Sequence, residues 1–152
     1  MMLSIVLSLF VLVASQVEVF KKEKASLQSA VDTEVTSTGA QVLQRSRAAY
    51  VEGYGVIVTL EVAFEGPQNP FSGYKRPEEL RVLIEQRRKQ VQEKVTALVK
   101  QRVGTMDWLG PNDSFTVIIH VLNANPADVP NLPVQIQISA RKESPQPTFR
   151  EF

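Results

Sequence analysis

The chain contains a single histidine, His120, the residue type best suited to general acid or base catalysis near neutral pH. It lies in the run Phe115 to Leu122, where apolar side chains recur at alternate positions. Alternate side chains of a strand point to opposite faces, so His120 is expected opposite the Phe115 face. Nothing in the local sequence supplies a serine or a carboxylate to work with it. We therefore interpret His120 as an exposed or interface histidine. A hydrolase-type enzyme that combines it with acids from distant segments is the alternative.

Arg87 interrupts the apolar stripe of a predicted helix between Ile84 and Val91, where a core residue is expected. A guanidinium keeps its charge, so burying it without a partner would cost several kcal/mol. The side chain must reach water, a carboxylate or a bound anion. We expect its stem to snorkel to the edge of the domain. The alternatives are a buried pair with Glu61 or Glu52, or an anion-binding role.

Basic residues continue from Arg87 through Arg88 and Lys89 on the same predicted helix. No aromatic residues interleave with these charges, and the formal net charge of the whole chain is only +1. Single-stranded nucleic acids are bound by basic and aromatic side chains together. The pattern therefore predicts a solvated helix face and no nucleic-acid partner.

Three aromatic residues, Tyr50, Tyr54 and Trp108, lie beside turn-forming residues. The segment Tyr50-Val-Glu-Gly-Tyr-Gly55 lacks the lysine and hydroxyl residue of a phosphate loop, and no helix opens behind it. We expect its glycines to permit a hairpin turn, with the tyrosines packed across it. Trp108 is expected to plug the end of the sheet, and surface recognition by Trp108 is the alternative. With Arg87 and His120, these three aromatics are the candidate interaction residues.

The composition excludes several kinds of chemistry. Without cysteine the chain forms no disulfide, thiol nucleophile or cysteine-ligated zinc site. With one histidine it cannot build a His/Cys metal cluster within one chain. The acidic residues Glu52, Glu61, Glu65, Asp107 and Asp113 lack the spacing of a carboxylate pair or a calcium loop. We predict no catalytic set, no metal and no cofactor.

The N-terminus resembles an export signal in its composition. From Leu3 to Ala14 the only polar residues are two serines, and Val13-Ala14-Ser15 offers small residues for cleavage. The run is short for a bilayer span, which takes about 20 apolar residues. Its first basic cluster, at residues 21–24, follows the run instead of preceding it, as in a short reverse anchor.

We predict a signal peptide over residues 1–15 and an exported protein, which is periplasmic, envelope-associated or secreted. The alternatives are a membrane anchor formed by residues 1–20 and a cytosolic domain with an apolar first strand. Residues 16–39 are rich in Ser, Thr, Lys and Glu and predict a solvated lead-in, with a short helix through residues 25–35 as the alternative. Residues 40–142 form the single predicted domain. Residues 143–152 contain two prolines that oppose ladder pairing and predict a flexible tail.

Four strands and one long helix are predicted within the domain. Strands over residues 41–50 and 54–64 precede the helix Pro77 to Val103, and strands over 115–122 and 134–141 follow it. At 1.5 Å per residue the helix is about 40 Å long, so one end should overhang the sheet. We predict an α+β fold of order β-β-α-β-β, a small four-stranded antiparallel sheet with one long amphipathic helix packed on one face.

The predicted sheet leaves apolar groups at Ile57, Ile118 and Leu122 on the face that the helix does not cover. Monomeric proteins rarely expose a large apolar patch. This pattern favours a non-enzymatic exported domain that binds a protein, either a second copy of itself or another envelope component. The rivals are the enzyme that uses His120 and a carrier of small apolar ligands, which needs a cavity of at least about 300 Å³. Membrane contact is expected only through the N-terminal segment, if it is not cleaved.

Overall fold

The computed structural model describes residues 2–66, 71 and 73–152, with side chains from Ser15 onward. A helix and a hairpin are followed by a second helix, a second hairpin and a final short strand. The elements are α1 (Met2–Thr36), β1 (Gln41–Val51), β2 (Gly55–Ala63), α2 (Pro77–Thr105), β3 (Ser114–Val121), β4 (Gln135–Arg141) and β5 (Thr148–Glu151).

The five strands form one mixed sheet in the order β1-β2-β3-β4-β5. The pairs β1–β2, β3–β4 and β4–β5 are antiparallel, whereas β2 and β3 run parallel. The α+β class is confirmed, but the all-antiparallel pairing that we predicted is wrong. The physical reason is the connection: α2 carries the chain back along the sheet, and strands joined by such a crossover helix run parallel.

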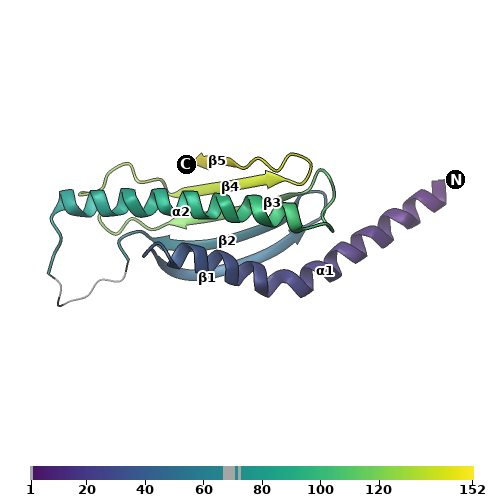
Figure 1. The fold of residues 1–152 in the computed structure, drawn as a ribbon, viewed down its shortest axis with the longest axis horizontal. Helices are drawn as coiled ribbons and strands as arrows, with labels where there is room; N and C mark the ends of the chain where they lie inside the picture. The colour runs from purple at the N-terminus through teal and green to yellow at the C-terminus, as the bar shows by residue number, and fades with distance from the viewer. Residues whose placement is uncertain (1, 67–70, 72) are drawn as a thin grey trace.

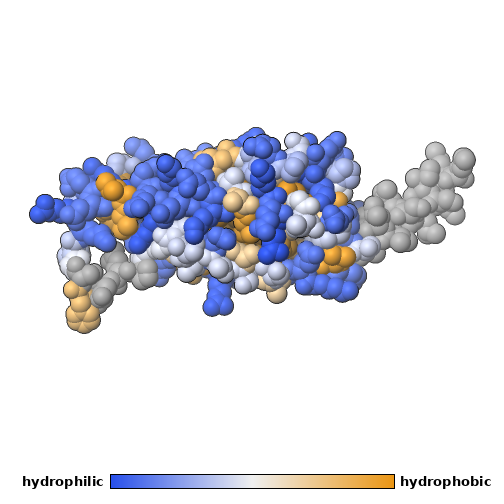
Figure 2. Space-filling view, in the orientation of Figure 1, coloured by the Kyte–Doolittle hydropathy of each residue, from blue (hydrophilic) through white to orange (hydrophobic). Residues whose placement is uncertain are grey.

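Both helices cover the same face of the sheet (Figure 1). α1 packs mainly on β1, and α2 packs on β3 and β4 and also against α1. Val58, Val117 and Ile138 of the sheet and Val95 of α2 are completely buried in this layer. The first turns of α2 extend past the sheet, as expected from the length of the helix (Figure 1), and Val82 there is 68% exposed. Figure 2 shows that the outer surface over α2 is largely hydrophilic.

The helix α1 is the largest departure from the predicted fold. Residues 16–36, which we expected in a solvated lead-in, continue one helix of 35 residues that begins at Met2. Phe20, Leu27, Val31 and Val35 are buried, and their spacing of seven, four and four residues places them on one side of the helix. Most of the intervening Ser, Thr, Lys and Glu residues are exposed or partly exposed, which explains the polar composition. The predicted architecture with a single helix is therefore wrong.

The backbone of α1 passes without a break through the predicted cleavage site, and its first turns project beyond the sheet (Figure 1). The side chains of residues 1–14 lie outside the described part of the structure. Among the helices that are described, none is long and apolar enough to cross a membrane.

The C-terminal segment also differs from the prediction. Residues Thr148–Glu151 form β5 and pair antiparallel with β4, so this end of the chain is not a flexible tail. Pro145 and Pro147 lie in the loop before β5, where they remove no ladder hydrogen bond. Phe149 packs against the core, and Arg88 of α2 donates two hydrogen bonds to Glu151, at 2.9 and 3.0 Å.

Candidate functional site

On the face of the sheet opposite the helices, no helix or strand of the described residues forms a second layer. We call this face the uncovered face and define it by the side chains that alternate away from the core. Along β1 to β5 they are Arg47, then Ile57, Thr59 and Glu61, then Thr116, Ile118 and His120, then Gln135, Gln137 and Ser139, and finally Arg150. Hydroxyl and amide groups predominate, with an arginine on each edge strand.

Three apolar side chains, Leu122, Phe152 and Ile118, lie toward one end of the uncovered face, with His120 and Gln135 between them; we call these three the apolar strip. Leu122 is 47% exposed and Phe152 is 59% exposed, while Ile118 is half-buried. Phe152 is fixed there because its backbone N–H donates to the Gln135 carbonyl, at 3.0 Å, and its carbonyl accepts from the Val134 N–H, at 2.8 Å. The strip is therefore held by the sheet and is not a loose end of the chain.

The other end of the uncovered face is closed by Tyr54, which lies in the β1–β2 turn. The Tyr54 hydroxyl is 3.1 Å from Thr116 Oγ1, and Thr116 Oγ1 is 2.7 Å from Ser139 Oγ. Thr116 is fully buried although it belongs to the uncovered face. The turn side chain thus covers Thr116 at this end of the face.

His120 is exposed on the uncovered face. The strand register places Glu61 of β2 on one side of it and Gln135 of β4 on the other. No hydrogen bond or ion pair is found for its ring within the described residues, and His120 lines neither the groove between α1 and β1 nor the one at the start of α2. The geometry shows no general base in a pocket at this position.

Tyr50 and Trp108 form an aromatic cluster with Phe20 of α1. The three ring centroids lie 6.1 to 6.4 Å apart in tilted arrangements. Tyr50 points to the helix side of the sheet and Tyr54 to the uncovered face, so the predicted packing of the two tyrosines across the turn is wrong. The turn that begins at Val51, with Gly53 and Gly55 at positive φ, interrupts the strand alternation between them, so they lie on opposite faces.

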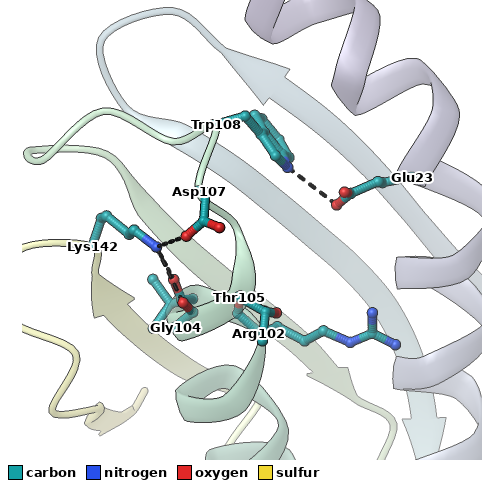
Figure 3. Close-up of polar contacts among 8 residues, drawn as sticks. Glu23, Arg102, Gly104, Thr105, Asp107, Trp108 and Lys142 are labelled. Carbon is teal, nitrogen blue, oxygen red and sulfur yellow. Dashed lines mark hydrogen bonds and ion pairs between the residues drawn. The ribbon is translucent and has the colours of Figure 1, made fainter.

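Polar side chains of α1 form hydrogen bonds with both Tyr50 and Trp108. The Tyr50 hydroxyl donates to Gln16 Oε1 at 2.7 Å, and Gln16 Nε2 donates to the Trp108 carbonyl at 3.0 Å. The Trp108 indole N–H donates to Glu23 at 3.2 Å (Figure 3). Burial, followed by the nearby carboxylates of Asp113 and Glu52, raises the pKa of Tyr50, so its hydroxyl remains a donor. This cluster fixes α1 to the end of the sheet.

The sequence contained a signal for this cluster that we did not use. Gln16, Phe20, Glu23 and Leu27 are separated by four, three and four residues, the spacing of one helix face. The partners are far away in the sequence: Tyr50 is 34 positions after Gln16, and Trp108 is 92 positions after it. The face was therefore visible in the sequence, but its partners were not.

Replacing Gln16 with alanine should lower the free energy of unfolding by about 1–2 kcal/mol, because two partly buried groups lose their hydrogen-bond partner. Urea denaturation followed by Trp108 fluorescence measures the change. Ser15→Ala is the matched control, since Ser15 is the exposed neighbour on the same helix. Equal midpoints for the two variants would show that Gln16 does not hold α1 on the sheet.

Arg87 binds backbone carbonyls at the end of β2. Its Nη1 donates to the carbonyl of Phe64, at 2.9 Å, and to that of Glu65. Gly39 and Gly66 line the guanidinium: a Cβ at Gly39 would lie 3.0 Å from Nε, and one at Gly66 would lie 2.7 Å from Nη1. Arg87 is partly exposed at the end of β2, and among the described residues no pair with Glu61 or Glu52 forms. The carbonyls left unpaired where β2 ends supply the partners instead.

Lys142 plays a similar part at the C-terminus of α2. Its Nζ donates to the carbonyls of Val103 and Gly104, each at 3.2 Å, and is 3.4 Å from Asp107 (Figure 3). A cation at this end of a helix satisfies carbonyls that lack intrahelical partners and opposes the helix dipole. This side chain joins the β4–β5 loop to α2 and is structural.

An open groove of about 1010 Å³ lies between the second half of α1 and the start of β1. Beside it, the backbone N–H of Ser46 donates to Asp32 at 3.0 Å, and that of Ala48 donates to Gln28 at 3.1 Å. These N–H groups belong to the free edge of β1, so α1 satisfies part of that edge. Strand addition by another chain is disfavoured there.

We next consider whether the acidic residues could bind a metal ion or act in acid–base catalysis. Within the described residues no group of three or more His, Asp or Glu side chains could hold a metal ion. Glu65 is buried, with Oε1 3.5 Å from the Asn125 amide and Oε2 without a hydrogen-bond partner in the described structure. One carboxylate and one amide do not make a catalytic pair.

Comparisons with known proteins give no further guide to the site. No protein-family model matches the chain, and neither a curated protein nor a solved structure matches it significantly.

Proposed function

We propose that the protein is an exported, non-enzymatic domain that works by binding another protein through its uncovered face. The partner is a second copy of the chain or another component of the envelope. Export is inferred from the apolar run between Leu3 and Ala14, which has the composition of a signal sequence.

The observation that carries the proposal is the apolar strip of Leu122, Phe152 and Ile118. Two of these large apolar side chains are exposed, and within the described residues no helix or strand packs over this face of the sheet. Protein contact surfaces combine apolar side chains with a polar rim. The strip has such a rim, formed by the hydroxyl, amide and arginine side chains of the uncovered face.

The two rival functions have weaker support. An enzyme based on His120 would need a hydrogen-bonded partner and a pocket; Glu61 is its neighbour on β2, but the described residues show no hydrogen bond to the exposed ring and no pocket around it. A carrier of apolar ligands would need space between the sheet and the helices. That layer is filled by completely buried side chains, including Val58, Val95 and Val117.

Photo-crosslinking in the producing cell tests the proposal. A photoreactive benzoyl-phenylalanine placed at Leu122 should give a discrete adduct, because this side chain lies at the centre of the proposed contact. An adduct of twice the chain mass identifies a second copy, and any other discrete mass identifies a different protein. The same probe at Val82, which is exposed on the helix side, should give none. The proposal fails if Leu122 gives no adduct or if both positions give the same ones.

A further inference from the structure

The packing of α1 bears on the fate of the N-terminal segment. Gln16 is the first residue after the predicted signal peptide. Its side chain already forms hydrogen bonds with the rest of the domain, to Trp108 and Tyr50. Gln16 is 8% exposed and Phe20, one turn later, is 7% exposed. The helix that presents both side chains begins fourteen residues before Gln16, at Met2.

Cleavage after Ser15 would make Gln16 the first residue of the chain. The first four N–H groups of a helix have no intrahelical partner, and a first turn frays readily. Gln16 and Phe20 would then lie in the fraying turn, beside Tyr50 and Trp108. In the described structure these two side chains lie within a continuous helix, so we expect their contacts to weaken when residues 2–15 are removed.

The retained segment has the composition of a lipid-binding helix. Residues 3–14 contain only two serines among apolar side chains, and the helix rise gives them a length of about 18 Å, less than the hydrocarbon core of a bilayer, about 30 Å. The backbone of this part projects away from the sheet (Figure 1). Three exposed bases, Lys21, Lys22 and Lys24, follow within three turns, and Lys21 is already paired with Glu18 at 2.7 Å. Apolar helices followed by basic side chains bind bilayers that contain anionic lipids.

We infer that residues 2–15 are retained in the working protein and insert into one side of a lipid bilayer, which holds the domain at the membrane surface. The inference does not depend on the proposed binding function. A bilayer fits the segment better than a bundle of helices from several copies, because such a bundle would bring the exposed lysines of each copy together, whereas anionic headgroups would neutralise them.

Flotation with vesicles of phosphatidylcholine containing one quarter phosphatidylglycerol tests the inference on the full chain. The wild-type chain should float with the vesicles. The variant Leu7→Asp/Phe10→Asp, with two charges in the apolar run, should lose binding by about tenfold or more. The variant Val82→Asp/Ala97→Asp places the same charges at exposed positions of α2 and should float like the wild type.

Thermal unfolding monitored by Trp108 fluorescence shows whether each variant keeps the domain fold. A second variant that lacks residues 2–10 retains the turn before Gln16 and should fold but remain unbound. Intact-mass measurement of the chain recovered from a host envelope should show residues 2–15 present. The inference is wrong if the mass corresponds to cleavage near Ser15, if the full chain does not float, or if the charged N-terminal variant floats like the wild type.

Discussion

Replacing Gly55 with alanine should lower the free energy of unfolding by about 3–5 kcal/mol, the sum of backbone strain and overpacking. Gly55 has a φ of +116°, a backbone conformation that residues with a side chain rarely adopt. A Cβ there would lie 2.1 Å from the carbonyl oxygen of Ser114 and 2.6 Å from its nitrogen. Both atoms are backbone, and the Ser114 N–H donates to the Tyr54 carbonyl at 2.7 Å. The parallel strands β2 and β3 would have to separate at this point.

Gly53→Ala is the matched control, because Gly53 also has a positive φ of +77° but has no atoms within 4 Å of its Cβ position. It should cost only about 1–2 kcal/mol, the penalty of the left-handed backbone alone. Urea denaturation followed by Trp108 fluorescence compares the two. Similar midpoints would mean that β2 and β3 do not approach each other as closely as described.

Replacing Arg87 with leucine should lower the free energy of unfolding by about 2–4 kcal/mol, because two buried carbonyls lose a charged donor. These are the carbonyls of Phe64 and Glu65, at the end of β2. Leucine would complete the apolar stripe of α2, but it offers these oxygens no hydrogen bond. The loss of the donor therefore outweighs the gain in apolar contact.

Lys89→Leu controls for the loss of a positive charge on α2. Lys89 is exposed, so this change should alter stability by no more than about 0.5 kcal/mol. Denaturation midpoints at one pH and salt concentration compare the variants. A neutral or stabilising Arg87→Leu would contradict the role of Arg87 as a link between α2 and the end of β2.

The elements with a strong period were predicted almost to the residue. The second predicted strand, 54–64, corresponds to β2 at Gly55–Ala63, because its β-branched residues alternate cleanly. The predicted helix from Pro77 corresponds to α2, which also begins at Pro77 and has Glu78 and Glu79 in its first turn. Local spacing and capping residues were sufficient for both.

The missed elements depend on partners that are distant in the sequence. α1 buries only a few large apolar residues at helical spacing, and its contacts with Tyr50 and Trp108 become evident only in the fold. β5 has four residues and follows two prolines, so its pairing depends on the position of β4. The parallel β2–β3 pair, in contrast, follows from the single helix that connects the strands, and we could have derived it.

The candidate site shows the same division. Alternation in β3 placed His120 and Ile118 on one face, but Phe152 joins them only because the C-terminal strand pairs with β4. Arg87 was recognised as an interruption of the apolar stripe, yet its carbonyl partners are 22 and 23 residues away in the sequence. The residue types in the sequence therefore showed which positions interrupt an apolar stripe or share a strand face. Only the fold showed which distant residues contact them.

Hydroxyl-radical footprinting tests most directly whether the uncovered face is the contact surface. The full chain is oxidised in the native envelope and, separately, as the dilute purified protein, and the modification of each side chain is compared. We expect Leu122 and Phe152 to be protected in the envelope, while Val82 on the helix side reacts equally in both samples. Equal reactivity of Leu122 and Phe152 in the two samples would contradict binding through the uncovered face.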